Sequence, residues 1–208
     1  MDADDWNARY RSADLVWSAD ANAFLVEEAA GLPPGTALDL GCGEGRNAIW
    51  LATNGWTVTA ADFSSVAVDK ARSIAAERGV TVDWHVADVV KWRPRGTFDL
   101  VVVLYVQLPE PERAAMLATA TTVLAPGGTL LVVAHSLRNL EEGFGGPRDP
   151  AVLPTPDEVE AEILAAAAAG SGPGVEIERA GDVERIADTP DGPRKALDLL
   201  VRVRRGLR

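Results

Sequence analysis

Short apolar runs alternate along the chain with segments whose apolar residues recur every three or four positions. The apolar runs, each short enough to be a strand, occupy residues 37–40, 57–61, 82–86, 98–104 and 129–134. Helical spacing marks the segments around them, at 19–30, 46–55, 64–75 and 111–124. Strands that alternate with helices predict right-handed crossovers and a parallel sheet.

The last third of the chain departs from this alternation. Thr155, Pro156 and Glu158 form a capping-box sequence with proline at the first helical position, so a helix is expected to begin there and to run to Ala169. The strand-like runs at 175–186 and 196–203 have no helical pattern between them, which predicts an antiparallel hairpin. The expected fold is α/β and doubly wound, with a mostly parallel seven-stranded sheet that ends in this hairpin.

A glycine-rich turn joins the first strand to the helix that follows it. Gly41, Gly43 and Gly45 stand at alternate positions, and only glycine lets the backbone turn this tightly beside a ligand. The spacing differs from the dinucleotide-binding pattern G-x-G-x-x-G, because Arg46 stands where its third glycine would fall. Asp39, just before the turn, suits a ligand with a positive charge and amine donors better than a pyrophosphate.

Two further acids follow the next strands. In an open parallel sheet the ligand lies beyond the carboxyl ends of the strands. Asp62, after the second strand, can accept hydrogen bonds from a pair of ribose hydroxyls, although it could also cap the helix near Ser64. Asp88, after the third strand, can accept from an adenine amino group while the Val89 N–H donates to the ring. Its alternative role is that of a solvated turn residue.

Composition narrows the class of protein. A chain of 208 residues with 47% hydrophobic and 25% charged residues fits one globular domain, 1–208. Its net charge of −11 argues against nucleic acid as a partner. Cys42 is the single cysteine, which excludes an internal disulfide, and it reads as a small filler rather than a nucleophile. With no apolar run near the roughly 20 residues of a membrane span and an acidic start, the prediction is a cytoplasmic protein away from the membrane.

Taken together, these motifs resemble those of the class I S-adenosylmethionine-dependent methyltransferases. The motifs that carry the resemblance are residues 38–45, Asp62, 87–89, 98–100 and 124–128, together with the terminal hairpin. The resemblance covers about residues 36 to 204 and implies a Rossmann-like sheet with S-adenosyl-L-methionine as cofactor. Trp6, Tyr10, Trp17 and the stretch 45–47 look in addition like the tellurite-resistance and thiopurine methyltransferase group.

The resemblance also implies roles for single residues. It places ten residues against the cofactor: Trp17, Asp39, Gly41, Gly43, Arg46, Asp62, Phe63, Asp88, Val89 and Leu104. Among them, Arg46 would face the cofactor carboxylate, Phe63 would pack on the adenine, and Leu104 would lie beside the sulfonium. Trp17 would cover the cofactor, since a cation gains from an aromatic face nearby; simple hydrophobic anchoring is its alternative role.

The acceptor side is expected at the ends of the fourth and fifth strands. Methyl transfer from a sulfonium is a direct displacement that depends mainly on alignment, and a base is needed only if the acceptor must lose a proton. His135 is the candidate base by position, with satisfied hydrogen bonding as its alternative, and Tyr105 is the second catalytic candidate. Tyr105, Gln107 and His135 would face the acceptor. His85 is read as structural.

The long segment after the fifth strand is expected to cover the acceptor. Residues 136–156 are predicted to form an active-site loop to which Arg138 and Phe144 contribute, and residues 1–35 a helical cap. No metal-binding constellation is evident. The predicted function is methyl transfer to a small molecule at O, N or S, by a monomer or homodimer. A cofactor-binding protein without transferase activity and a dinucleotide oxidoreductase are the alternatives.

Overall fold

The computed structural model describes residues 3–16, 18–170, 172–187, 189 and 191–207. The helices are α1 (Ala3–Arg11), α2 (Ala23–Ala29), α3 (Arg46–Thr53), α4 (Ser65–Glu77), α5 (Glu112–Thr122), α6 (Asn139–Glu142), the 3₁₀ turn η1 (Pro150–Val152) and α7 (Pro156–Ala169). The strands are β1 (Thr36–Leu40), β2 (Thr57–Asp62), β3 (Val82–Val86), β4 (Phe98–Leu104), β5 (Leu124–His135), β6 (Val175–Ala187) and β7 (Arg194–Arg205).

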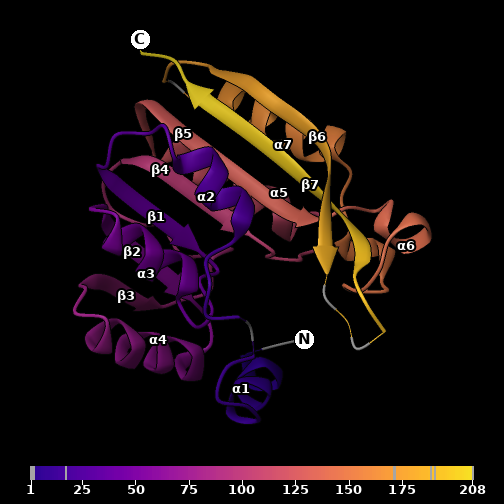
Figure 1. Ribbon diagram of the computed structural model, residues 1–208. Coiled ribbons are helices and arrows are strands. Elements are labelled where there is room, and N and C mark those ends of the chain that lie inside the picture. Colours follow the sequence, from indigo (N-terminus) through magenta and orange to yellow (C-terminus); the bar gives the residue numbers. More distant parts are fainter. Residues whose placement is uncertain (1–2, 17, 171, 188, 190, 208) are drawn as a thin grey trace.

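All of these strands form one sheet (Figure 1), in the order β3-β2-β1-β4-β5-β7-β6. The five strands from β3 to β5 are parallel, whereas β7 runs antiparallel to both of its neighbours. The chain therefore leaves β1 on one side toward β2 and β3 and returns on the other side with β4. This reversal is where ligands bind in such sheets. The predicted α/β, Rossmann-like sheet with a terminal antiparallel hairpin is confirmed.

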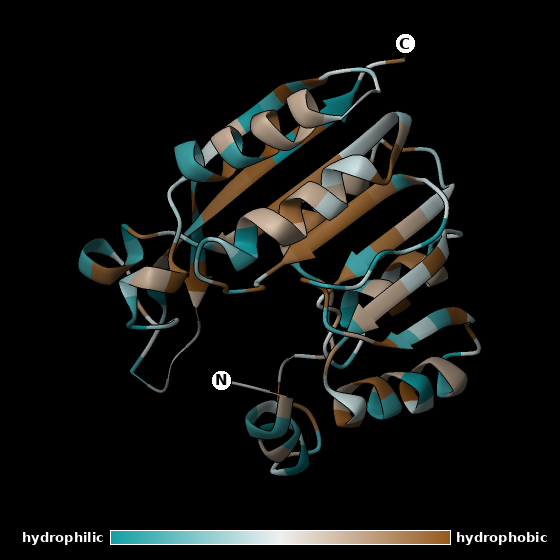
Figure 2. Ribbon diagram, turned by 180° about the vertical axis from the view of Figure 1, so that it is seen from behind, coloured by the Kyte–Doolittle hydropathy of each residue, from teal (hydrophilic) through white to brown (hydrophobic). Residues whose placement is uncertain are grey.

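The central strands are buried on both faces, and alternate residues feed two separate cores. On β4, Val101 and Val103 face one cluster while Leu100, Val102 and Leu104 face the other. Figure 2 shows the middle strands as hydrophobic along their length between covering helices. A strand covered on both faces reads as a continuous apolar run, which is why 98–104 shows no alternation.

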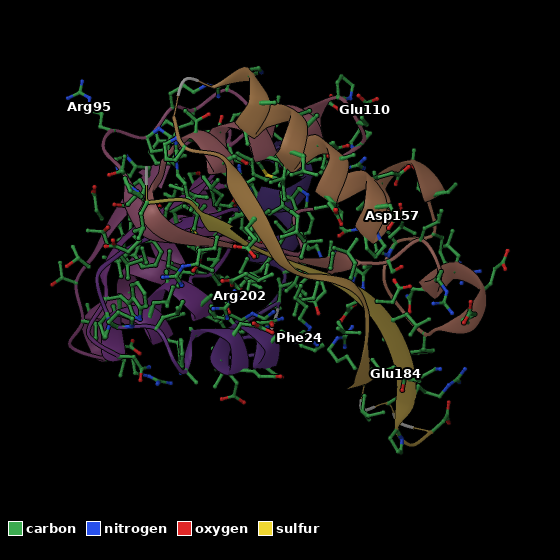
Figure 3. All side chains as sticks on the ribbon, turned by 90° about the horizontal axis from the view of Figure 1, so that it is seen from above. Phe24, Arg95, Glu110, Asp157, Glu184 and Arg202 are labelled. Atoms are coloured by element: carbon green, nitrogen blue, oxygen red, sulfur yellow. The ribbon has the colours of Figure 1, made fainter. Side chains whose placement is uncertain are left out.

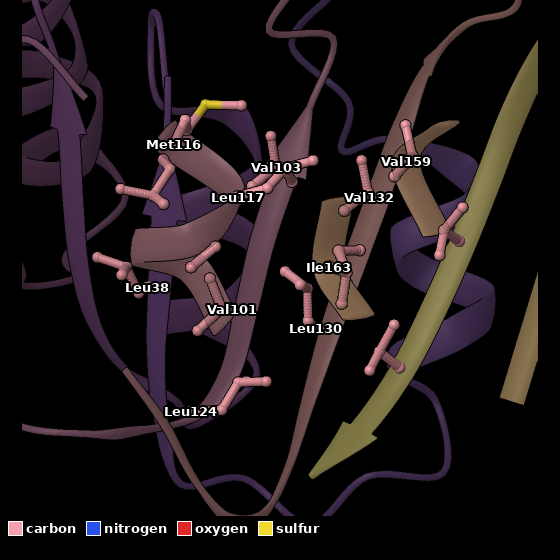
Figure 4. Packing of buried hydrophobic residues seen from close by; sticks show 14 of the residues in the cluster. Leu38, Val101, Val103, Met116, Leu117, Leu124, Leu130, Val132, Val159 and Ile163 are labelled. Carbon is pink, nitrogen blue, oxygen red and sulfur yellow. The ribbon is translucent and has the colours of Figure 1, made fainter. Parts of the chain in front are cut away.

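Helices cover both faces of the sheet. Met116 and Leu117 of α5 pack with Val159 and Ile163 of α7 over one face (Figure 4). On the opposite face the second cluster joins Leu25 and Ala29 of α2 with Ala48 and Leu51 of α3. The α5–α7 layer is held together further by a polar contact, since the Arg113 guanidinium of α5 donates to both carboxylate oxygens of Glu162 on α7.

The hairpin is also tied to α2. The Arg202 guanidinium of β7 donates to the carbonyl oxygen and to the carboxylate of Glu28. Figure 3 shows Arg202 and Phe24, which belongs to α2, on the same side of the molecule. Along the described ranges of the chain, the helices are all too short or too polar to traverse a bilayer.

Several predicted boundaries were wrong, each for a reason that the structure shows. Helix α2 begins at Ala23 rather than at residue 19, because the Asn22 side chain accepts hydrogen bonds from the first helical N–H groups. Strand β5 begins at Leu124 rather than at 129: Leu124 pairs with Phe98 across a register shift, so the Pro-Gly-Gly sequence lies inside the strand. Residues 136–156, which were predicted to form a loop, contain the short helix α6 and the turn η1.

The N-terminal helix is attached through α4. The Asn7 side-chain oxygen accepts from the Ser64 hydroxyl and the Val66 N–H at the start of α4. The Lys70 ammonium donates to the carbonyl oxygens of Tyr10, Ala13 and Asp14. Helix α1 thus lies beyond the carboxyl ends of the parallel strands (Figure 1), beside the region where the sequence predicts the ligand.

Candidate active site

The turn after β1 has the conformation that its glycines predict. Gly41, Gly43 and Gly45 all have positive φ, at 78°, 52° and 80°. The N–H groups of Gly41 and Cys42 both donate to the Ala61 carbonyl of β2, which holds the turn against the neighbouring strand. A Cβ at Gly43 would lie 2.9 Å from the Tyr10 hydroxyl oxygen. The backbone of the turn is therefore approached closely by the N-terminal segment.

Asp62, at the end of β2, is buried and fixed by the backbone. One carboxylate oxygen accepts from the Gly43 N–H and the other from the Ser64 N–H, each at 2.9 Å. Burial raises the pKa of Asp62, and these two N–H groups act in the opposite direction. Because each carboxylate oxygen has two lone pairs, both retain acceptor capacity. Asp62 joins the glycine turn to the start of α4, and its carboxylate keeps unused acceptor capacity.

Asp39 is a buried acid whose hydrogen bonding is incomplete. Its side chain is 1% exposed, and one oxygen, Oδ2, has no partner within the described part of the chain. Burial first, and then the nearby Asp62 carboxylate, raise the pKa of Asp39 to about 7, against the effects of Arg46 and the Ala48 N–H. A buried acceptor without a donor is costly. Its environment is suited to a cationic donor that arrives with a ligand.

A cavity of about 480 Å³ opens at the ends of β2 and β3, where Ala3, Phe63, Val86, Ala87 and Asp88 line it. Phe63 and Asp88 were both predicted to contact the cofactor, and the structure brings them together here.

Asp88 itself is held in place by neighbours. Its carboxylate accepts from the Val90 N–H and pairs with the Lys91 ammonium at 3.0 Å. Burial would raise the pKa of Asp88, but these hydrogen bonds outweigh it, so the pKa lies below its usual value. The carboxyl group is therefore ionised near neutral pH and able to accept a hydrogen bond. Val89, next to it, has a buried side chain.

The end of β4 leads to the predicted acceptor side. Leu104 is buried and Tyr105 has a φ of 58°, which is uncommon for a residue other than glycine. Such backbone strain gathers at functional sites. The Gln107 side chain accepts from the His135 N–H and donates to the Val152 carbonyl. It therefore holds the ends of β4 and β5 and the turn η1 in one place.

Tyr105 and His135 meet at a carboxylate that sequence reasoning missed. Asp198 of β7 is fully buried and accepts from the Tyr105 hydroxyl at 2.6 Å, while its other oxygen lies 3.0 Å from His135 Nδ1. The Arg185 guanidinium of β6 donates to the same group at 2.7 Å. The feature of the sequence that could have pointed to Asp198 is the presence of an acid in the middle of the apolar run 196–203.

Other predicted residues lie elsewhere or have different partners. The Arg138 guanidinium is exposed and pairs with Glu142 and Asp182, and Phe144 lies under the Arg194 guanidinium. Trp17 lies outside the described residues. His85 pairs with Asp83 on the surface of β3. A second missed residue is Glu44, which is buried and accepts from the Val16 N–H and Lys70.

Arg46 connects the two halves of the site. Its guanidinium donates to the Ser18 hydroxyl. Burial lowers the pKa of Arg46, while Tyr105 and Asp39 act to raise it. Arg46 is thus near enough to interact with the glycine turn on one side and with the Tyr105 group on the other. The structure therefore gathers most of the predicted residues along one edge of the sheet.

Part of the chain is similar to known methyltransferases. Residues 37–128 match the family model described as "Methyltransferase domain". The chain is 31% identical over 127 residues to 2-heptyl-1-hydroxyquinolin-4(1H)-one methyltransferase of Mycobacteroides abscessus, a match that covers 59% of this chain and 55% of that protein. The chain spans about half the length of the curated relatives it matches.

Solved structures agree on the fold. N-methyltransferase NodS from Bradyrhizobium japonicum, in complex with S-adenosyl-L-homocysteine, superposes with a TM-score of 0.73 at 19% identity, covering 98% of this chain and 97% of that one. TehB from Haemophilus influenzae gives 0.70 at 16% identity, covering 96% and 66%. At such identities the likeness concerns the fold alone. Together with the strand order, these structures show a Rossmann-like methyltransferase fold, within which residues 37–128 are similar to a methyltransferase domain.

Proposed function

We propose that this protein transfers a methyl group from S-adenosyl-L-methionine to a small-molecule acceptor. The observation that carries the proposal is the buried Asp39 carboxylate, whose Oδ2 has no partner among the described residues. It lies directly before the glycine turn at the carboxyl edge of the sheet. S-adenosyl-L-methionine carries an ammonium group and a sulfonium, and an ammonium is the kind of donor that this carboxylate lacks.

The residues present fit the rest of this cofactor. Asp62 retains acceptor capacity for the ribose hydroxyls, and the cavity between Phe63 and Asp88 suits an adenine ring. Arg46, close enough to Asp39 to affect its pKa, suits the cofactor carboxylate. The remaining proposed contacts are Trp17, Gly41, Gly43, Val89 and Leu104. The bound cofactor supplies an activated methyl group on a positively charged sulfur.

The chain's own contribution is mainly alignment and exclusion of water. Tyr105, Gln107 and His135 stand at the ends of β4 and β5, beside the proposed sulfonium position. Residues 136–156 would cover the acceptor, with Arg138 and Phe144 at its rim, and residues 1–35 would cover the cofactor. The curated relative that acts on a hydroxyquinolinone supports hydroxylated heteroaromatic compounds as the first acceptors to try.

Isothermal titration calorimetry with S-adenosyl-L-methionine tests the cofactor assignment. The wild type should bind, and both Asp62→Ala and Gly43→Val should abolish binding, the first by removing the ribose acceptor and the second by placing a branched side chain against Tyr10. Asp191→Ala, in an exposed position between β6 and β7, is the control and should bind normally. Unchanged affinity in both site variants would rule the assignment out.

A panel of small hydroxyl, amine and thiol acceptors then separates the alternatives. Transfer of a labelled methyl group to any of them supports the proposal. Tight cofactor binding with no transfer would favour a binding protein, and a change in nicotinamide fluorescence on mixing would favour a dinucleotide oxidoreductase. Membership of the tellurite-resistance and thiopurine group predicts transfer to soft sulfur-type acceptors. Gel filtration distinguishes the monomer from the homodimer, and the acidic surface predicts no retention on nucleic acid.

A further inference from the structure

Asp198 is the most completely buried acid of the acceptor side, and three side chains from three other parts of the sheet converge on it. Its Oδ2 accepts from the Tyr105 hydroxyl at 2.6 Å and from Arg185 Nε at 2.7 Å. Its Oδ1 lies 3.0 Å from Nδ1 of His135. Although burial opposes ionisation, the hydrogen bonds from His135, Arg185 and Tyr105 lower the pKa of Asp198. The group is therefore a carboxylate that can only accept.

This geometry determines where His135 carries its proton. Because an ionised carboxylate has no proton to donate, the imidazole must donate through Nδ1. In the neutral ring Nε2 is then the unprotonated, basic nitrogen. No residue in the described ranges bonds Nε2. The ring is held in place by the Tyr105 ring, whose centroid lies 4.9 Å away, and by Gly146, where an added Cβ would lie 3.0 Å from the imidazole.

The same contacts exclude Tyr105 as the base. Its hydroxyl proton is donated to Asp198, and burial together with that carboxylate raises the pKa of the phenol well above its usual range. Arg185 also donates to the phenol oxygen at 3.2 Å. Tyr105 is thus a neutral donor that helps to hold Asp198. Of the two catalytic candidates, only His135 therefore has an atom, Nε2, that is free to accept a proton.

We propose that Asp198 is a positioning residue, which fixes His135 with its proton on Nδ1 so that Nε2 takes a proton from a hydroxyl group of the methyl acceptor. The inference rests on the proposed function. The acceptor oxygen loses its proton to Nε2 and forms a bond to the methyl carbon, while the carbon–sulfur bond breaks and its electron pair stays on sulfur. The imidazolium that results faces the Asp198 carboxylate and later releases the proton to water. The acceptor class is a phenol or enol.

Long-range ¹H–¹⁵N NMR of the full labelled chain tests this arrangement without any acceptor. The chain has two histidines, and the His85 contact runs through the other nitrogen, Nε2, to Asp83. In a buffer of about pH 9, where an imidazole is ordinarily neutral, His135 should show the Nδ1–H tautomer. His85→Gln assigns the signals. The Nε2–H tautomer at His135 in the wild type would overturn the proposal.

Asp198→Asn gives the second test. The single oxygen of the amide should turn toward Arg185 and Tyr105, which are donors, so its NH₂ group faces His135 Nδ1. Nδ1 must then accept, and the His135 proton moves to Nε2. The matched control is Asp83→Asn, the other histidine-paired acid, which should leave the His135 signals unchanged. An unchanged His135 tautomer in Asp198→Asn would also overturn the proposal.

Kinetics separate this inference from the proposed function. With a simple phenol as acceptor, Asp198→Asn and His135→Gln should each lower kcat by about 10²-fold or more, as loss of a general base does, with the KM for S-adenosyl-L-methionine unchanged. With a thiophenol, which is already deprotonated in solution, the same two substitutions should lower kcat far less. Equal losses on both acceptors would overturn the role of Asp198. Failure of the wild type to bind the cofactor would instead count against the proposed function, with the tautomer result still standing.

Discussion

At the scale of single residues, three buried acids differ in how completely their carboxyl groups are hydrogen-bonded. Asp62 accepts from two backbone N–H groups, and Asp198 accepts from a histidine, an arginine and a tyrosine. Asp39 has an oxygen without a partner in the described chain. An unsatisfied buried acceptor destabilises the folded state. A ligand that donates a hydrogen bond to Asp39 would therefore stabilise the protein more than one that donates to Asp62 or Asp198.

Asp39 makes the stability of the cofactor-free protein depend on pH. Its pKa is raised from 3.8 to about 7, so between these values the unfolded chain has lost a proton that the folded chain keeps. The unfolded state binds fewer protons, and the contribution of Asp39 to stability therefore falls as the pH rises through this window, by about 4 kcal/mol at most. Urea unfolding at a series of pH values measures the effect.

Asp39→Asn serves as the comparison for that series. The amide does not titrate, so the difference in unfolding free energy between variant and wild type should grow in favour of the variant from about pH 4 to about pH 8. Asp191→Asn, at an exposed position, should follow the wild type at every pH. A constant difference between Asp39→Asn and the wild type would contradict the raised pKa of Asp39.

At the scale of elements, the α5–α7 layer shows how one helix face was selected. Helix α7 is rich in alanine, and its faces differ little in hydropathy. Val159 and Ile163 are nevertheless fully buried against the sheet, while Leu164 is 41% exposed. The capping box of Thr155 and Glu158 fixes where the helix begins. The start of α7 was therefore predictable, but the face that it buries depends on its packing against α5.

Neighbouring substitutions in α7 test this division. Ile163→Ala should destabilise the protein by about 2–5 kcal/mol, because it removes buried methyl groups and leaves a cavity. Leu164→Ala, one residue further on, should cost less than about 1 kcal/mol, since surface substitutions away from special features have small effects. Chemical denaturation of the two variants provides the measurement, and similar losses in both would mean that α7 is packed differently.

At the scale of the whole molecule, the site is built from distant parts of the chain. Helix α1 reaches the glycine turn through Tyr10, and the hairpin brings Asp198 and Arg185 to the end of β5. Lys70 of α4 anchors the N-terminal segment, because its ammonium meets three backbone carbonyls and the buried Glu44. The affinity for the cofactor should therefore depend on Lys70, although Lys70 does not line the cavity that contains Phe63.

Lys70→Met tests this anchor. Without the ammonium, the carbonyls of residues 10–14 lose their donor, so amide hydrogen exchange in α1 should accelerate and the affinity for S-adenosyl-L-methionine should fall by about tenfold, as loss of a charged hydrogen bond predicts. Lys195→Met removes a lysine whose pair with Glu184 is exposed and should change neither property. Protection of α1 that equals the wild type would show that Lys70 is dispensable for docking.

Much of the fold and of the cofactor side could be predicted from the sequence, because both follow local rules. Glycines at alternate positions force the turn after β1, and buried parallel strands read as apolar runs. The acids that follow those strands share one edge of the sheet by topology. Residues 124–128 were misjudged because their pairing with β4, across a register shift, overrides the local preference of proline and glycine to end a strand.

By itself, the sequence thus determined where the parallel strands lie along the chain, the glycine turn and the positions of Asp39, Asp62 and Asp88, since each depends on neighbours within a few positions. Only the tertiary structure decided the acceptor side. Asp198 lies 63 residues from His135 and 93 from Tyr105, and nothing local marks it except its position in an apolar strand. Its role exists because β7 pairs antiparallel with β5 and sets Asp198 opposite His135, a long-range contact that no short segment encodes.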